Sequence, residues 1–163
     1  MHTPFRLAVG CLLFLAACGS NDPKFLTDDG YRALGKGDSK SAVQDFDKAM
    51  KRMDPSKPDY LRAAVGHCQA LAGLDGKKAK DEFLELARAQ PSRVTEQDFS
   101  MVVDALSRGH SLVDAVDVMH AGVQMFPESP KMEALREAVV EESQKADDPE
   151  ALKSLKGLGY IGK

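Results

Sequence analysis

Apolar residues recur at spacings of three and four along most of this chain, which is the period of an amphipathic helix. The clearest case is the stretch 42–55, which ends on an Asp-Pro pair. One helical face carries its apolar residues, namely Ala42, Phe46, Ala49 and Met53. Weaker copies of the pattern run over 79–91 and 115–127, and each of them also closes on a proline. Three helices of similar design are therefore predicted.

A second apolar-periodic helix precedes each copy. Helix starts are indicated by Asp22-Pro23, by Ser56-Lys57-Pro58 and by Thr95, where Asp98 three residues later completes a sequence close to a capping box. Glycines break the chain between the two helices of each pair, namely Gly35 and Gly37, Gly73 and Gly76, and Gly109. The pattern predicts three antiparallel helix hairpins over 22–56, 57–92 and 93–127, and the second helix of the first hairpin is expected to reach Asp54.

The hairpins recur at a nearly fixed period, because Ala79 follows Ala42 by 37 residues and Ala115 follows Ala79 by 36. Such a period is typical of a solenoid of helix pairs. The chain resembles the tetratricopeptide (TPR) repeats, in which a small residue opens the second helix, an aromatic residue follows one turn later and a proline closes the repeat. The resemblance implies an all-α, TPR-like antiparallel helix-hairpin solenoid. The alternative is an unrelated helical bundle with accidental alanine spacing.

The match to TPR repeats varies along the chain. In the first repeat the matching residues are Gly30, Ala33, Gly37, Ala42, Phe46 and Ala49. In the second, Gly66 aligns with Gly30, which requires one extra residue in the turn between the two helices. In the third, Val103 stands at the glycine position and Met119 at the aromatic position.

Two further helices are expected after the repeats. Ser129-Pro130 opens a capping helix within 128–146, which would cover the apolar face of the last repeat. Asp148-Pro149 opens a short helix that ends near Gly157, and an apolar tail completes the segment 147–163. This tail either folds back onto the cap or docks onto a partner.

Composition and charge agree with a helical globular chain. Hydrophobic residues make up 43% of the sequence, charged residues 29% and aromatic residues 6%, and tryptophan is absent. The formal net charge is -3, with acidic and basic residues mixed along the chain. No basic stripe is present for a phosphate backbone, so nucleic acid is not expected as a partner.

The N-terminus is typical of a secretion signal, because Met1 and Arg6 precede an apolar run over 7–15. Its end, Leu15-Ala16-Ala17-Cys18, resembles the bacterial lipobox. The resemblance implies that the signal peptide 1–17 is cleaved and that Cys18 is lipidated, with 18–21 as a short linker. The alternative is an ordinary signal peptide with a chance cysteine.

The N-terminal sequence also predicts where the protein is located and which cysteine keeps a free thiol. Gly19 is not the aspartate that retains lipoproteins in the inner membrane of enteric bacteria, so we expect a lipid-anchored protein on the periplasmic face of the outer membrane. After processing, Cys68 is the only unmodified cysteine, and no intrachain disulfide is expected.

No catalytic or metal-ligating motif emerges from the sequence. His67, His110 and His120 have no metal-ligand spacing with cysteine or acidic residues. The adjacent His67 and Cys68 would point about 100 degrees apart on a helix, which does not suit a nucleophile and its base. We therefore expect a protein that is not an enzyme, with no cofactor, no metal and no small-molecule substrate.

The TPR resemblance implies a partner groove along the first helix of each repeat. Its register places the groove positions at Thr27, Tyr31 and Leu34, at Ala63, His67 and Ala70, and at Ser100, Asp104 and Ser107. In this register Tyr31, His67 and Asp104 are equivalent, and they are the first candidates for partner binding. Such a groove suits an extended peptide or a helix from another envelope protein.

Together these observations predict a membrane-anchored lipoprotein that scaffolds or assembles an envelope complex. Two alternatives stay open. The chain could be an accessory subunit of a periplasmic enzyme, docked through its C-terminal tail, or a structural lipoprotein that associates with itself.

Overall fold

A computed structural model describes residues 22–162, which form eight helices and no strand. In chain order these are α1 (Pro23–Gly35), α2 (Ser39–Met50), α3 (Pro58–Ala72), α4 (Gly76–Ala89), α5 (Glu96–Arg108), α6 (Leu112–Met125), α7 (Pro130–Ala146) and α8 (Pro149–Gly157). The predicted all-α class is confirmed. The signal peptide, the lipobox and Cys18 lie outside the described residues.

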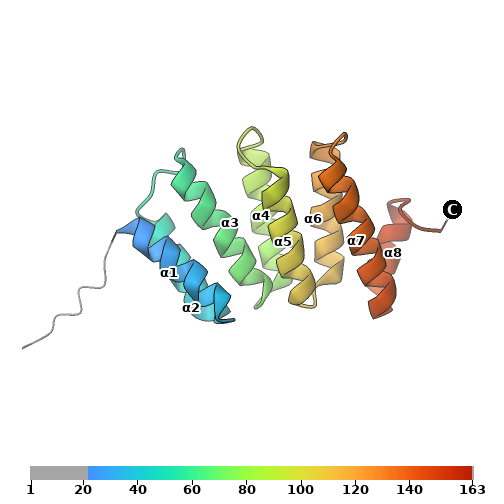
Figure 1. Cartoon of the computed structure of the whole chain (residues 1–163), viewed down its shortest axis with the longest axis horizontal. Helices are drawn as coiled ribbons and strands as arrows, with labels where there is room; N and C mark the ends of the chain where they lie inside the picture. The colour runs from blue at the N-terminus through green and yellow to red at the C-terminus, as the bar shows by residue number, and fades with distance from the viewer. Residues whose placement is uncertain (1–21, 163) are drawn as a thin grey trace, which may run out of the picture.

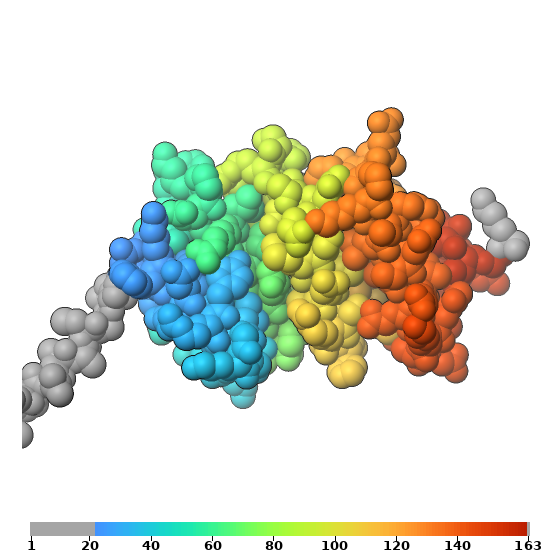
Figure 2. Space-filling view, in the orientation of Figure 1, coloured from blue at the N-terminus to red at the C-terminus, as the bar shows by residue number. Residues whose placement is uncertain are grey.

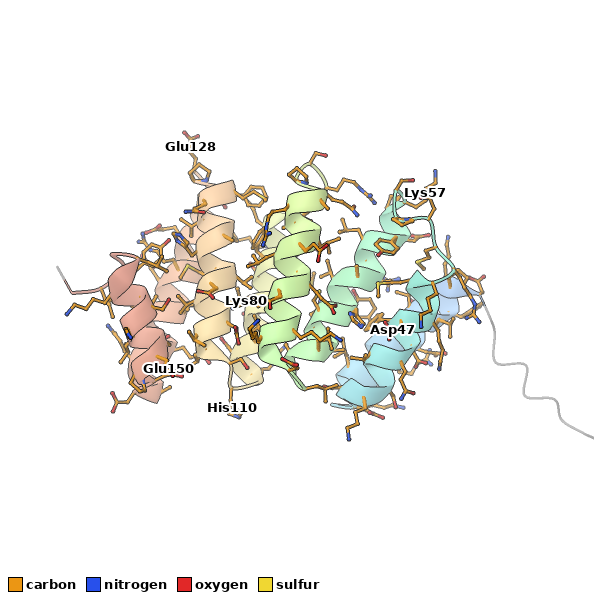
Figure 3. All side chains as sticks on the ribbon, turned by 180° about the vertical axis from the view of Figure 1, so that it is seen from behind. Asp47, Lys57, Lys80, His110, Glu128 and Glu150 are labelled. Atoms are coloured by element: carbon orange, nitrogen blue, oxygen red, sulfur yellow. The ribbon has the colours of Figure 1, made fainter. Side chains whose placement is uncertain are left out.

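Successive helices alternate between two layers (Figure 1). The odd-numbered helices form a front layer, in which α1 packs on α3, α3 on α5 and α5 on α7. The even-numbered helices form a back layer, which Figure 3 shows from behind. The stack runs from α1 and α2 at one end to α7 and α8 at the other. None of the helices within 22–162 has the length and apolar character needed to cross a bilayer.

Side-chain caps are present at most helix starts, and those of α1, α5, α7 and α8 lie where the sequence indicated them. Aspartate side chains cap α1, α2, α4 and α8, and a serine side chain caps α7. The capping box of α5 is present, since the Thr95 amide donates to Asp98 Oδ2 at 2.8 Å and the Asp98 amide donates to the Thr95 hydroxyl. One end differs from expectation, because α2 stops at Met50 and not at Asp54. A turn over 51–53 follows it, and Asp54 accepts a hydrogen bond from the Ser56 amide at 2.8 Å.

The turns between front and back helices all have the same length. Each back helix begins four residues after its front helix ends, at Gly35 and Ser39, Ala72 and Gly76, and Arg108 and Leu112. The extra residue expected in the second turn is therefore absent, and the alignment of Gly66 with Gly30 is wrong. With turns of equal length, the residue twelve positions before each of the alanines Ala42, Ala79 and Ala115 is equivalent in the three pairs. These residues are Gly30 before Ala42, His67 before Ala79 and Val103 before Ala115.

Phe46 joins the two layers at the start of the stack. Its ring is fully buried and meets the Tyr31 ring edge-on, with 5.0 Å between centroids. A Cβ added at Gly30 would lie 2.8 Å from Phe46 Cε1, and one added at Gly66 would lie 2.5 Å from Phe46 Cζ. Both glycines therefore let a front helix approach this ring more closely than any side chain would allow.

A second, larger core continues from α3 to α8. Phe83 meets Phe99 edge-on at 5.0 Å between centroids, and Phe99 in turn meets Phe126 at 6.0 Å. At the C-terminal end Met132 of α7 and Leu155 of α8 are almost completely buried. The predicted capping helix α7 thus does not cover the last repeat alone, because α8 packs on both α6 and α7.

The C-terminal tail folds back onto the chain, which was one of the two expectations for it. Leu158, Tyr160 and Ile161 pack on the larger core. The Tyr160 hydroxyl lies 2.7 Å from His120 Nδ1, and the Arg136 guanidinium lies over the Tyr160 ring at 5.6 Å from its centroid. Burial raises the pKa of the Tyr160 hydroxyl, although the Arg136 charge opposes this effect.

Candidate functional site

The stack has several hollows, and two of them lie on opposite layers, one on the front and one on the back. The first, here called the front hollow, has a volume of about 510 Å³ and lies where α3 recedes between the ends of α1 and α5, at the lower edge of Figure 2. It is lined by Leu34, Gly35, Gly37, Ser39, Gln69, Gly73, Ala105, Arg108 and Gly109. Residues from all three helix pairs therefore contribute to one surface.

Small residues and one cation determine the chemistry of the front hollow. Four of its lining residues are glycines, so backbone is accessible there for hydrogen bonding. Arg108 is exposed, and no acidic side chain among residues 22–162 forms an ion pair with it. Gln69 adds a half-buried amide. The hollow can thus accept an extended segment that offers backbone groups and a carboxylate.

The groove residues expected from the sequence divide into several groups. Leu34 lines the front hollow, and Asp104 is exposed on α5. Ser100 is half-buried, and its hydroxyl donates to the Glu96 carbonyl of its own helix at 3.0 Å. Ser107 is half-buried and lines a separate hollow beside the end of α7. Of these four side chains, only Leu34 and Asp104 are thus accessible to a partner on the front layer.

Tyr31 is half-buried in contacts with its own chain. Its hydroxyl donates to the Arg62 carbonyl at 2.8 Å, and the Arg62 guanidinium lies 4.9 Å from the centroid of its ring. Burial raises the pKa of the Tyr31 hydroxyl, against the opposing charge of Arg62. Tyr31 therefore fastens α1 to α3.

The prediction that Thr27 and His67 line the groove is wrong, because both side chains are buried. Thr27 is 1% exposed, and its hydroxyl donates to the Pro23 carbonyl at 2.8 Å. His67 is 6% exposed and faces the back layer, because the revised register makes it equivalent to Gly30 and not to Tyr31. Ala63 and Ala70 are also fully buried. Tyr31, His67 and Asp104 therefore do not line one surface.

His67 lies between two carboxylates on neighbouring back helices. Its Nε2 is 3.3 Å from Asp47 Oδ1 of α2, and its Nδ1 is 3.1 Å from Glu82 Oε2 of α4. A protonated imidazole donates from both nitrogens, whereas a neutral one donates from a single nitrogen. In the structure each ring nitrogen of His67 faces one carboxylate oxygen. His67 thereby connects α2 with α4.

The second hollow, here called the back cleft, opens above His67. It has a volume of about 330 Å³ and is lined by Met50, Pro55, Tyr60, Ala64, His67, Cys68, Glu82, Glu85, Leu86, Ala89 and Gln90. It lies between α2 and α4, which do not pack directly against each other, whereas α4 packs on α6 and α6 on α8. Figure 3 shows Asp47 of α2 beside this gap.

Cys68 lies in the back cleft as a buried thiol. Burial, together with the nearby Glu82 charge, raises its pKa to about 12. A thiol nucleophile requires the opposite, namely a lowered pKa that populates the thiolate. This environment suits packing, as expected from the sequence.

An ion-pair cluster joins the next two back helices. Lys80 Nζ of α4 lies 3.0 Å from Asp114 Oδ1 and 3.1 Å from Asp117 Oδ2 of α6. Burial alone would lower the Lys80 pKa, but the hydrogen bonds to both aspartates outweigh it and raise the pKa. Sequence reasoning missed this cluster. Its signal is the spacing of Asp114 and Asp117 at 34 and 37 residues after Lys80, which is close to the 36-residue period between these two helices.

Potential metal ligands do not cluster within the described part of the chain, where no group of three or more histidine, cysteine, aspartate or glutamate side chains could hold an ion. Comparison with known proteins finds no family model that matches the chain, and no significant match among curated proteins or solved structures.

Proposed function

We propose that this chain is a lipid-anchored TPR-like protein of the bacterial envelope that binds a segment of another envelope protein and acts as a scaffold or assembly factor. The observation that carries the proposal is the front hollow, to which all three helix pairs contribute. The lipobox ending at Cys18 supports the membrane anchor, and Gly19 after it supports the assignment to the outer membrane. The near-constant period of the helix pairs supports the TPR-like solenoid.

The front hollow suits an extended segment with an acidic side chain or a terminal carboxylate. The free guanidinium of Arg108 is the group that would bind this carboxylate, because arginine forms paired hydrogen bonds with carboxylates. Leu34 supplies an apolar contact on the α1 side. The tail is packed on α6 and α7, which favours the scaffold over an accessory subunit docked through that tail.

Photocrosslinking in the native envelope tests this function. A photoreactive amino acid at Asp104, which is exposed one turn before Arg108, should capture a defined partner. Charge reversal in Arg108→Glu should remove the product, while Arg88→Glu, an exposed site on the back helix α4, should leave it unchanged. A product of equal yield in all three backgrounds would contradict binding at the front hollow.

The anchor is tested separately. A radiolabelled fatty acid should be incorporated into the parent chain and not into Cys18→Ala. Incorporation that survives the substitution would place the lipid elsewhere.

A further inference from the structure

The back cleft carries a second inference, which does not depend on the front hollow. We infer that it binds a lysine or arginine side chain of a partner protein, with the aliphatic part of that side chain among the apolar residues and its charge beside Glu85. Three properties of the cleft support this occupant, namely its place in the back layer, the arrangement of polar and apolar residues along it, and its uncompensated charge.

The place of the cleft follows from the spacing of the back helices. Lys80 bridges α4 to α6, and those helices pack directly. Between α2 and α4 no such packing occurs, and His67 reaches from α3 to make the connection. The floor of the cleft is thus a fixed, buried side chain, and the walls are two separate helices.

Most of the apolar residues of the cleft lie toward one end of it. Because α3 runs antiparallel to α4, the early residues of α3 lie beside the late residues of α4. Tyr60 and Ala64 therefore lie with Leu86 and Ala89, and Met50 at the end of α2 joins them. His67 and Glu82 lie further down, as their contact shows. An occupant that is apolar at one end and polar at the other matches this arrangement.

The charge of the polar part is negative and incompletely balanced. Glu82 pairs with His67 and also lies 3.7 Å from Lys78 Nζ, and Asp47 pairs with His67. Glu85 faces the same cleft, and no cationic side chain of residues 22–162 forms an ion pair with it. A cation that enters from outside would therefore find a free carboxylate next to an apolar wall.

The combination selects a long cationic side chain over other ligands. Lysine and arginine carry an aliphatic stem that packs on apolar surface and a charged end that stays in a polar region. An anion would meet the charges of Glu82 and Glu85, and a wholly apolar group would gain nothing from the exposed carboxylate of Glu85. The Tyr60 ring adds an aromatic surface at the rim, which attracts cations.

Small analogues of these side chains test the inference on the full chain. The chain with Cys18→Ser is purified in non-ionic detergent, and its amide NMR signals are followed during titration with n-butylammonium, the analogue of the lysine side chain. Propylguanidinium represents arginine, and n-butanol and pentanoate are the neutral and anionic controls. Both cations should shift signals of 60–68 and 82–90 in a saturable way, and both controls should bind more weakly.

Matched variants identify the charge that is responsible. Glu85→Gln removes the free carboxylate with almost no change in shape, and it should weaken n-butylammonium binding about fivefold, as expected for one partly exposed ion pair. Glu128→Gln, an exposed glutamate in the turn after α6, has the same charge change and should have no effect (Figure 3). Equal binding of n-butanol and n-butylammonium, unchanged affinity in Glu85→Gln, or shifts confined to residues outside the cleft would each overturn the inference.

Discussion

At the scale of single residues, Gly66 of α3 lies so close to the buried ring of Phe46 that an added methyl group would collide with it. Two effects of an added methyl group oppose each other at this position. Alanine is favoured over glycine in a helix by about 1 kcal/mol. A Cβ 2.5 Å from Phe46 Cζ, however, forces the two helices apart, and overpacking of this kind costs about 1 to 3 kcal/mol.

We therefore expect Gly66→Ala to lower the free energy of unfolding by up to about 2 kcal/mol in urea denaturation. Gly35→Ala is the matched control, because no atom lies within 4 Å of the added Cβ there. That variant should be neutral or slightly more stable. Equal behaviour of the two variants would mean that Phe46 does not limit the approach of α3.

The Lys80 cluster gives a second prediction at this scale. In Lys80→Met the Asp114 side chain, which is 12% exposed, keeps its charge without a partner, and a loss of about 2 to 3 kcal/mol follows. Adding Asp114→Asn should recover part of this loss. Denaturation of the single and double variants at pH 7 measures both effects. A single variant as stable as the parent chain would contradict a stabilising role for the cluster.

This contribution should also depend on pH. The Lys80 pKa is higher in the folded chain than in the unfolded one, where lysine titrates near pH 10.4. The stabilisation is therefore complete below about pH 10 and is lost as the pH rises through the folded-state pKa. The stability difference between the parent chain and Lys80→Met should be constant from pH 7 to 9 and shrink above that range.

Cys68 should be protected from alkylation in the folded chain. Its pKa of about 12 leaves almost no thiolate at pH 8, and its side chain is buried. Iodoacetamide labelling, measured on the peptide that contains Cys68 by mass spectrometry, should be at least tenfold slower in the native chain than in urea. Equal rates in the two conditions would show that the back cleft opens readily.

At the scale of helices, the sequence was sufficient to place most starts and ends. Prolines, aspartate caps and the Thr95 capping box act within one turn, so their effect is local. The direction of the side chains was harder to predict. A slip of one residue turns a helix by about 100 degrees, and the alignment of Gly66 with Gly30 therefore assigned His67 to the front layer.

The contacts of two hydroxyl groups were also not predicted from the sequence. Thr27 and Ser100 bond to carbonyls of their own helices, a local option that a repeat pattern does not reveal. The front hollow was partly predicted through Leu34. Arg108 and Gln69 were not predicted, because their place depends on how far α3 recedes between α1 and α5.

The cap of α8 allows a prediction for a whole element. Asp148 accepts hydrogen bonds from the Glu150 and Ala151 amides, both at 3.0 Å. Asp148→Ala should cost about 1 kcal/mol and increase amide hydrogen exchange in α8. Asp148→Asn retains an acceptor and should change exchange little. A rise in exchange that spreads equally to α1 would indicate global unfolding and not loss of a cap.

At the scale of the whole molecule, the C-terminal helix pair closes the stack. Met132, Val139 and Leu155 are each at most 2% exposed, and they cover α5 and α6. A chain that ends at Pro127 should therefore expose this core, bind a hydrophobic dye and associate in light scattering. A chain that ends at Gly157 keeps both helices and should remain monomeric. A monomeric chain without α7 and α8 would show that the cap is dispensable.

The gap between α2 and α4 also has a mechanical consequence. Elsewhere, neighbouring helix pairs touch in both layers, so bending must compress or stretch two sets of contacts. Between the first and second pairs the back helices are connected through the side chain of His67 and through α3. Bending at this joint is therefore resisted mainly by the packing of α1 and α2 on α3, and a tilt of the first helix pair would widen or narrow the back cleft without compressing contacts between α2 and α4.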